Sequence, residues 1–561
     1  MEKSAVFRQN LQALSKNNPE LCAMLSKAKT TENRYTFLQS RAGELIPARL
    51  DPSGTARPLH SMMDPQKEAR RLIDSEEGEC FLILLGLGAG YYAEAALERN
   101  DVSKVLVIEY DINGLAELFN SLDYTRLFSD PRFSLFADLS EAELQRLIIN
   151  SYQPVLCGSI RVIPLRSRTS IDAQPFSRAA RVIASAIDKV STDYSVQAHF
   201  GKRWFGNIIR NLKNIEETEQ SLPFAERAVV TAAGPSLSLQ IERLREKRSG
   251  VFLIAADTSL PCLLHAGIIP DAVISIDCQH ISYYHFMSGL PEEVPLYLDL
   301  ASPPLLASLS KKRRFFSCGH PLTRYISQTW RALPELDSSG GNVTYAAVSL
   351  AEQMGVREIE LYGADYSYPR GASYAKGTYI HSFFAKKANR FSPLEAQASA
   401  FLFRTPLEKI VAGDSWYYQT KTLNFYREKL EEKSHSMEAA LIPVEGMGAP
   451  INVKRIENPK PQTQKNKCIS GIAENSGKTK RKAEEFLSEY MDSVKNLPMP
   501  GKNSSEYINA LSKEDKAVFI SLLPLIAAFK HRHQEMSFRE LLEDVKDYCC
   551  KEIDAVKKQK T

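Results

Sequence analysis

Between residues 228 and 362 the sequence repeats one pattern, a short apolar run followed by a stretch long enough for a helix. Continuous apolar runs are typical of strands that are covered on both faces, as the strands of a parallel sheet are. Strands that alternate with helices favour a doubly wound α/β fold, with helices on both faces of the sheet. The predicted strands are 228–232, 251–256, 272–276, 295–300, 314–318 and 358–362, and the predicted helices between them include 237–248 and 344–354.

An earlier stretch of the chain predicts a second, smaller α/β unit. The apolar run 81–85 leads into Gly86-Leu87-Gly88-Ala89-Gly90, a helix is expected over 91–98, and the next strand, 104–108, ends at Glu109. Strand, glycine turn, helix, strand and acidic residue follow one another in the order of a Rossmann-like first unit. Such a turn can hold a cofactor, but its glycines are equally explained by a tight turn and close helix packing.

The remaining segments divide the chain into parts. At 561 residues the chain is too long for a single core. We expect residues 1–200 to form a helical segment, mostly helical to about residue 70, plus the Rossmann-like unit, and 201–455 the larger sheet domain. Residues 456–480, which are polar and rich in Lys, are expected to be a linker. Residues 481–561 are expected to be all helical, with cap signals at Ser512 and Ser537.

Composition excludes several classes of protein. The formal net charge is only +4, which gives no general argument for binding nucleic acid or an anionic membrane. No apolar stretch reaches the roughly twenty residues that a membrane span needs, and the N-terminus lacks the features of a signal peptide. The nine cysteines include no Cys-x-x-Cys pair. We therefore expect a cytoplasmic protein that partners neither nucleic acid nor a membrane.

The loop Gly234-Pro235-Ser236-Leu237 is the first candidate site, because it joins a predicted strand directly to a predicted helix. Backbone N–H groups at a helix N-terminus suit a phosphate, Gly234 would let a ligand approach the backbone, and Ser236 could donate its hydroxyl or cap the helix. No Lys-Ser/Thr follows, so this is not a Walker loop. The alternative is a plain helix cap.

Acidic residues follow three of the predicted strands directly. They are Asp257, Asp277 and Asp365. The carboxyl ends of parallel strands face the ligand crevice, so three such residues suggest a polar cleft, to which Tyr366 is added as a candidate contact. A second turn, with Gly340, Gly341, Asn342 and Thr344 as its candidate contacts, opens another helix and offers a second set of backbone donors. Together these features predict a nucleotide or sugar-phosphate site.

The chemistry of that site is expected to need no metal or other cofactor. The sequence contains no Asp-x-Asp, and no His pair has zinc-ligand spacing. Backbone dipoles and side-chain donors would then stabilise a leaving phosphate. His381, in a Tyr- and Lys-rich loop beyond the last strand, is the candidate general base because the ordinary pKa of histidine lies near neutrality. A lone loop histidine can also be incidental.

These motifs, in this order, resemble the motility-associated factor (Maf) family, whose central domain is also called DUF115 or MptE-like. The resemblance covers about residues 59–450. It rests on Gly234-Pro235-Ser236-Leu237, Ile274-Ser275-Ile276-Asp277, Gly340-Gly341-Asn342-Val343-Thr344 and Glu360-Leu361-Tyr362-Gly363-Ala364-Asp365, with Leu59-His60-Ser61, the Gly86–Gly90 turn and Arg203-Trp204 with Asn207 and Asn211 further upstream.

The resemblance implies a flagellin glycosyltransferase, and so a role in motility. Family members are thought to transfer nonulosonic acids, such as pseudaminic or legionaminic acid, from CMP to Ser or Thr of flagellin. The central domain is similar to metal-independent bacterial sialyltransferases. By that similarity the Gly234–Ser236 loop would hold the nucleotide, Gly340–Thr344 the phosphate and cytosine, and His381 would be the base.

One departure and two alternatives remain. Many family members carry Thr-His-Ala soon after the last aspartate, where this chain has Ser373-Tyr374-Ala375, so either His381 takes the proton or this branch handles it differently. A pterin-type pyrophosphokinase using ATP and Mg²⁺ shares the central domain. A non-catalytic adaptor that binds flagellin is the third hypothesis.

Overall fold

The computed structural model describes residues 4–28, 34–50, 55–74, 78–216, 222–413, 415–454, 456, 481–501, 507–508 and 510–558. The described chain divides into two compact units. The first lies within Met1–His199, Leu497–Lys516 and Leu523–Val545, and the second within Phe200–Asn496, Ala517–Leu522 and Lys546–Thr561. The predicted linker lies outside the described residues apart from residue 456.

The first unit contains a four-stranded, fully parallel sheet with strand order β6-β5-β4-β7. Its strands are β4 (Cys80–Leu85), β5 (Val102–Glu109), β6 (Phe133–Ala137) and β7 (Ser159–Pro164). Every residue of β4 is buried, as its unbroken apolar sequence predicts. Helix α4 (Tyr91–Glu98) begins directly after the Gly86–Gly90 turn, so the Rossmann-like unit is confirmed.

The expectation that the chain is mostly helical up to about residue 70 is wrong in part. Helices α1 (Ala5–Ser15) and α2 (Pro19–Lys27) are followed by an antiparallel sheet of β1 (Tyr35–Gln39), β2 (Leu45–Leu50) and β3 (Ala56–Pro58), before α3 (Pro65–Ile73). Strands of three to six residues give too weak an alternation to be recognised beside a polar composition. The other helices up to residue 216 are α5 (Ile112–Ser121), α6 (Thr125–Ser129), α7 (Glu141–Ser151), α8 (Pro154–Cys157), α9 (Arg166–Ile171) and α10 (Ala173–Glu216).

The second unit is built on a seven-stranded parallel sheet with order β12-β11-β10-β9-β8-β13-β17. All six predicted strands are present. The strands are β8 (Arg227–Thr231), β9 (Phe252–Ala256), β10 (Ala272–Ser275), β11 (Leu296–Asp299), β12 (Arg313–Phe316), β13 (Glu358–Tyr362) and β17 (Ala440–Pro443).

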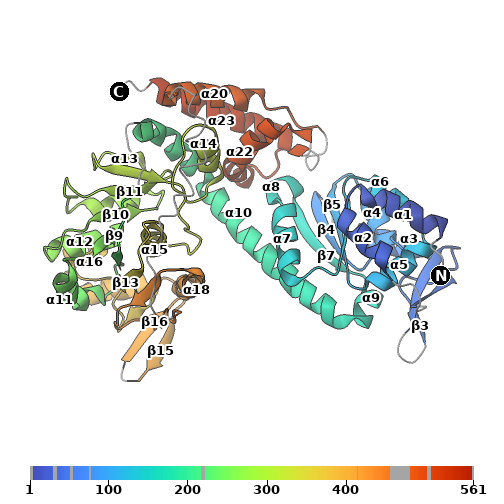
Figure 1. Ribbon diagram of the computed structural model, residues 1–561, viewed down its shortest axis with the longest axis horizontal. Helices are drawn as coiled ribbons and strands as arrows, with labels where there is room; N and C mark the ends of the chain where they lie inside the picture. The colour runs from blue at the N-terminus through green and yellow to red at the C-terminus, as the bar shows by residue number, and fades with distance from the viewer. Residues whose placement is uncertain are drawn as a thin grey trace. The chain divides into compact units, whose positions relative to one another are not determined.

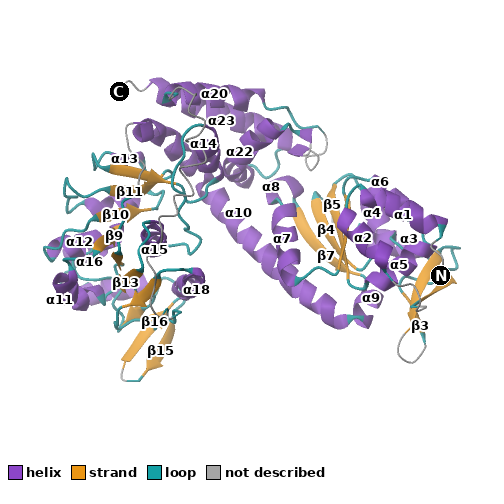
Figure 2. Ribbon diagram, viewed as in Figure 1, coloured by secondary structure: helices purple, strands orange, loops and turns teal. Residues whose placement is uncertain are grey.

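Helices cover both faces of this sheet (Figures 1 and 2). From β8 to β12 the chain moves in one direction across the sheet, and right-handed crossovers then place the connecting helices on one face. The return to β13, on the other side of β8, brings α15 onto the opposite face. There α15 packs against core residues of β8, β9 and β10 such as Val230, Ile254 and Ile274. The helices up to β13 are α11 (Leu237–Lys247), α12 (Leu260–His265), α13 (Pro304–Ala307), α14 (Pro321–Thr329) and α15 (Val343–Gln353), with 3₁₀ helices η1 (Asp257–Ser259) and η2 (His280–Phe286).

A long excursion separates β13 from β17. It carries helices and a small antiparallel sheet of order β14-β16-β15. The sequence did not predict β17, a four-residue edge strand about eighty residues after its neighbour. The elements of the excursion are β14 (Tyr368–Pro369), α16 (Tyr379–Lys387), α17 (Leu394–Leu402), β15 (Glu408–Ala412), β16 (Ser415–Gln419) and α18 (Lys421–Ser436).

The C-terminal part is helical, as predicted. Its described helices are α20 (Ala483–Asn496), α22 (Lys513–Arg532) and α23 (Phe538–Lys558). Both predicted caps are present: the Ser512 hydroxyl accepts the N–H of Asp515 at 3.0 Å, and Ser537 forms the corresponding bond with Glu540 at 3.3 Å. Among the described residues, no helix combines the length and apolarity that crossing a membrane requires.

Candidate functional site

The order of strands in the second unit locates a ligand crevice. Strands β9 and β13 lie on opposite sides of β8. The chain runs from β8 to β9 in one direction and from β13 to β17 in the other, so the two connections run in opposite directions across the sheet. Loops therefore separate at the carboxyl ends of β8 and β13, and ligands of doubly wound proteins bind at such a switch point. The Gly234 turn follows β8, and Asp365 follows β13. The structure thus brings two of the predicted site segments together.

At this point the Gly234 turn is bonded to the segment after β13. Gly234 N–H donates to the carbonyl of Gly363 at 2.8 Å. The N–H of Ser236 donates to Asp365 Oδ2 at 2.8 Å, and the Ser236 hydroxyl donates to Asp365 Oδ1. A Cβ at residue 234 would stand 2.5 Å from the Gly363 carbonyl oxygen. Glycine is needed here because two backbones meet, whatever ligand binds.

These bonds use the donors that the sequence analysis expected to be free. Pro235 has no N–H, the N–H of Leu237 bonds back to Gly234 at 3.0 Å, and Ser236 is 1% exposed. The Asp365 carboxylate lies at the N-terminus of α11, where the helix dipole favours a negative charge. Burial raises its pKa, and the hydrogen bonds from Ser236 oppose that shift. Direct contacts of this turn with a nucleotide stay a prediction.

The second predicted turn lies at the same edge of the sheet, because α15 runs from the carboxyl ends of the strands to the start of β13. Gly341 has φ +73°, and the Asn342 side chain caps the helix by accepting the N–H of Tyr345 at 3.0 Å. Gly340 is buried against the ring of Tyr345, where a Cβ would clash. Thr344 is buried in the first turn. The turn therefore begins a helix at the carboxyl edge of the sheet, and contacts of its residues with a ligand stay a prediction.

The strand-end acids differ in their surroundings. Asp257 is 4% exposed and accepts hydrogen bonds from the Ser275 hydroxyl and the N–H of Thr258, both at 2.6 Å. Burial raises its pKa, while the charge of His285 opposes that shift. Asp277 is half-buried and accepts the N–H of Gln279 at 2.9 Å. Asp257 and Asp277 end neighbouring strands, so the acidic edge is present.

Asp299 and His285 belong to the same edge, and the sequence analysis missed both. Asp299 is the last residue of β11, and burial raises its pKa to about 7. A carboxyl with that pKa can exchange a proton near neutral pH. The signal available for Asp299 was an acidic residue inside an apolar run. His285 carried no signal, because only packing of η2 against η1 brings it near Asp257.

His381 lies in a cavity of about 580 Å³. It is half-buried in the first turn of α16, where Thr378 caps the helix. Burial, followed by the positive charge of Lys376, lowers the pKa of His381, so the imidazole is neutral at pH 7 and able to accept a proton. The cavity is lined by Pro261, Leu264, His265, Ser288, Lys376, Gly377, His381 and Ser382.

The segment before α16 is attached to the Gly234 turn. Ala375 N–H donates to the carbonyl of Ala233 at 2.9 Å, and Lys376 N–H donates to the Ser238 hydroxyl at 3.0 Å. Burial raises the pKa of Tyr374, which the family resemblance aligns with the histidine of Thr-His-Ala, to about 12. Its phenol therefore stays protonated near neutral pH and cannot act as the base.

Tyr366 follows Asp365 with φ +43°, a conformation that is strained for a side chain of this size. It is 8% exposed and packs in the core with residues of α15. Its hydroxyl is buried without a hydrogen-bond partner among the described residues. An unpaired buried hydroxyl is unfavourable, so this residue remains a candidate ligand contact.

Two asparagines of α10 form hydrogen bonds with loops at the carboxyl edge of the sheet. Asn207 donates to the carbonyls of Cys278 and Ala301 at 3.0 and 2.8 Å, and Asn211 donates to Leu300 and Ser302 at 2.9 and 2.8 Å. They fix the loops after β10 and β11. Within the described ranges, no group of three or more His, Cys, Asp or Glu side chains is arranged to hold a metal ion.

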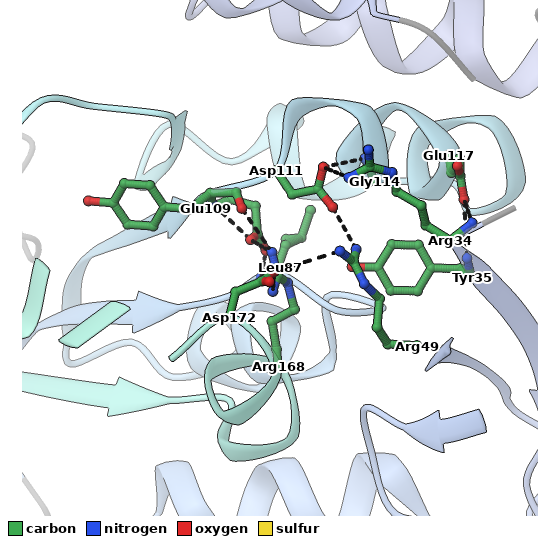
Figure 3. A network of polar contacts seen from close by, with 11 residues as sticks. Arg34, Tyr35, Arg49, Leu87, Glu109, Asp111, Gly114, Glu117, Arg168 and Asp172 are labelled. Atoms are coloured by element: carbon green, nitrogen blue, oxygen red, sulfur yellow. Dashed lines mark hydrogen bonds and ion pairs between the residues drawn. The ribbon is translucent and has the colours of Figure 1, made fainter. Parts of the chain in front are cut away.

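The Gly86–Gly90 turn of the first unit is filled by the protein itself (Figure 3). Glu109, the acidic residue of the Rossmann-like pattern, is paired with Arg168 at 2.6 Å and accepts the N–H of Leu87 at 3.2 Å. His60 Nε2 accepts the N–H of Ala89 at 2.9 Å. The charge and donors that would meet a nucleotide are thus already paired, which favours the structural interpretation of these glycines.

The fold and the order of the strands define a protein with a doubly wound α/β domain. Residues 202–371 match the family model described as 6-hydroxymethylpterin diphosphokinase MptE-like. An uncharacterized protein of Treponema pallidum (strain Nichols) is 30% identical over 168 residues, which are 29% of this chain and 80% of that protein. The chain therefore belongs to the MptE-like (DUF115) family that its motifs resemble.

Two further relatives and one solved structure extend this likeness. Other uncharacterized T. pallidum proteins are 32% identical over 152 residues (26% of this chain, 54% of that protein) and 24% identical over 299 residues (53% and 61%). The chain thus spans little more than half the length of these two. A Maf glycosyltransferase from Magnetospirillum magneticum AMB-1 has a similar structure, with a TM-score of 0.59 and 13% identity over 98% of this chain and 95% of that one. The chain has the fold of a Maf glycosyltransferase.

Proposed function

We propose that the protein is a glycosyltransferase that transfers a nonulosonic acid from a CMP-activated donor to Ser or Thr of flagellin. The observation that carries the proposal is that the fold of a Maf glycosyltransferase extends over 98% of this chain, well beyond the central domain. A pyrophosphokinase that shared only the central domain would not account for that extent. The acidic edge of the sheet, the N-terminus of α15 and the cavity at His381 support the proposal, because each supplies polar groups of the kind that this reaction needs.

The proposed reaction needs one base and a stabilised leaving group. The acceptor hydroxyl oxygen attacks the anomeric carbon of the sugar, the bond from that carbon to the phosphate oxygen breaks, and CMP leaves. His381 accepts the hydroxyl proton, for which its lowered pKa is suitable. Backbone donors in the first turn of α15 stabilise the phosphate, and neither a metal nor another cofactor takes part. The reaction would take place in the cytoplasm, where flagellin and the donor are available.

Calorimetry with CMP, UMP, ATP and GTP tests the nucleotide, and mass spectrometry of flagellin incubated with protein and CMP-nonulosonate tests the transfer. We expect CMP to bind more tightly than the other three nucleotides. We also expect the mass of flagellin to increase by one sugar, both with and without EDTA in the reaction. His381→Ala should abolish transfer while leaving CMP binding intact, and His265→Ala, in the same cavity, serves as the matched control. Equal binding of all four nucleotides would reject the CMP assignment, and flagellin binding without a mass change would favour the adaptor hypothesis.

The match of residues 202–371 to the MptE-like model favours one other function, a pterin-type pyrophosphokinase. That reaction transfers a diphosphate from ATP and depends on Mg²⁺. ATP binding that requires Mg²⁺, together with AMP release in the presence of a hydroxymethylpterin, would replace the glycosyltransferase proposal.

A further inference from the structure

Three segments that are far apart in the sequence meet at the switch point of the second unit. They are the Gly234 turn, the residues after β13, and a loop after β17 that we call the 444–449 loop. The Ser236 hydroxyl accepts the N–H of Met447 at 2.7 Å while donating to Asp365. Asp365 in turn accepts, through its carbonyl, the N–H of Ala449 at 2.9 Å. Hydrogen bonds at Ser236 and Asp365 thus join the three segments to one another, and we call this set of bonds the connection.

A second residue of α11 strengthens the same connection. Gln240, one turn after Ser236, accepts the N–H of Gly363 at 2.8 Å and donates to the carbonyls of Val444 and Glu445 at 3.2 and 2.9 Å. It is 5% exposed. All of its polar atoms are therefore used inside the protein, and none is left for a ligand.

Glycines permit the close approach. A Cβ at Gly446 would stand 2.5 Å from Ser236 Oγ, and one at Gly448 would clash with the backbone of Asp365. Residues with side chains at these positions would push the 444–449 loop away from the turn. The 444–449 loop can therefore approach Ser236 and Asp365 this closely only because residues 446 and 448 are glycines.

We propose that Ser236, Asp365 and Gln240 are positioning residues: they hold the 444–449 loop against the Gly234 turn and so set one wall of the nucleotide crevice. Both oxygens of the Asp365 carboxylate are bonded to Ser236 at the N-terminus of α11, and the pair is almost fully buried. This wall shapes the crevice without the Asp365 side chain contacting the ligand. That a nucleotide binds in this crevice rests on the proposed function, whereas the hydrogen bonds among the three segments do not.

Hydrogen exchange of the full chain tests the connection without any ligand. Ser236→Ala removes the acceptor of the Met447 N–H, so exchange in the 444–449 peptide should become about tenfold faster, which is the effect of losing one hydrogen bond. Asp365→Asn should accelerate exchange in the same peptide. Asp271→Asn is the matched control, since Asp271 accepts the N–H of Leu253 at 2.7 Å at the opposite edge of the same sheet. Unchanged exchange at 444–449 in both site variants would overturn the proposal.

Calorimetry with CMP tests the consequence for binding. Ser236→Ala and Asp365→Asn should each lower the affinity for CMP about tenfold. The double variant should bind CMP as tightly as the single variant with the lower affinity, because both substitutions act through one connection. Additive losses, or CMP binding as tight as in the wild type despite faster exchange, would overturn the positioning role. Wild-type protein that binds no CMP would reject the proposed function, while the exchange result would still decide whether the connection exists.

Discussion

The buried pair of Glu109 and Arg168 allows a quantitative prediction. The Arg168 side chain is 0% exposed and that of Glu109 is 2% exposed, so Arg168→Met leaves a carboxylate buried without its cation. Breaking a buried pair in this way costs about 3–5 kcal/mol. Glu109 keeps hydrogen bonds from the N–H groups of Leu87 and Tyr110, at 3.2 and 2.9 Å. We therefore expect a loss of about 3 kcal/mol in the free energy of unfolding of the first unit.

Adding Glu109→Gln to Arg168→Met removes the unpaired charge, and we expect it to restore about 2 kcal/mol. Asp172→Asn is the control, because Asp172 also pairs with Arg168 but its side chain is 30% exposed. It should cost less than about 1 kcal/mol. The assay is urea unfolding followed by hydrogen exchange in β4 and β5, which reports on this unit alone.

The reasoning is refuted if Arg168→Met lies within about 0.5 kcal/mol of the wild type, or if the double variant is as unstable as the single one. Either result would mean that the buried carboxylate is not what Arg168 stabilises. A Rossmann-like turn that opened to nucleotides in the Arg168→Met variant would in addition show that the arginine blocks a site.

Three further predictions concern other residues. Gly234→Ala places a Cβ 2.5 Å from the Gly363 carbonyl oxygen, so urea unfolding of the second unit should show a loss of about 1–3 kcal/mol, and a neutral effect would contradict the close approach. Lys376→Met removes the charge that helps to lower the pKa of His381, so the acidic limb of the transfer rate should move to higher pH; no movement would mean that His381 is not the base. Burial lowers the pKa of His60 from 6.5 to about 4, so its contribution to stability is complete above pH 6.5 and is lost as the pH falls through 4. The loss should reach about 3 kcal/mol in denaturant titrations, and His60→Gln should not show it.

Two strands of the first parallel sheet, β4 and β5, and six of the seven strands of the second could be predicted, because burial on both faces favours apolar residues over most of a strand. The sequence analysis did not find β6, β7 or β17. β9 is a continuous apolar run and was found nearly to its ends. β13, Glu358–Tyr362, was also found, although glutamate alternates with apolar residues in it. The Ser512 and Ser537 caps were found for a similar reason, since a cap bonds to residues two or three positions away in the sequence.

The candidate site was predicted only in part. The sequence placed Gly234, Asp365 and Asp257 at the carboxyl edge, because parallel strands share that edge. It could not indicate that Asp365 pairs with Ser236, since the two residues are 129 positions apart. Nor could it show that β17 returns to the sheet and brings Met447 to the Ser236 hydroxyl.

The same division between features encoded by near neighbours and features that depend on distant contacts holds for the whole protein. Its sequence by itself determined two parallel-sheet units, their glycine turns and a helical C-terminal part, because periodicity and capping act between near neighbours in the chain. Only the tertiary structure decided which turn is filled by Arg168 and which polar groups near Gly234 are already paired. Those outcomes depend on contacts between distant segments, and no local pattern of residues encodes them.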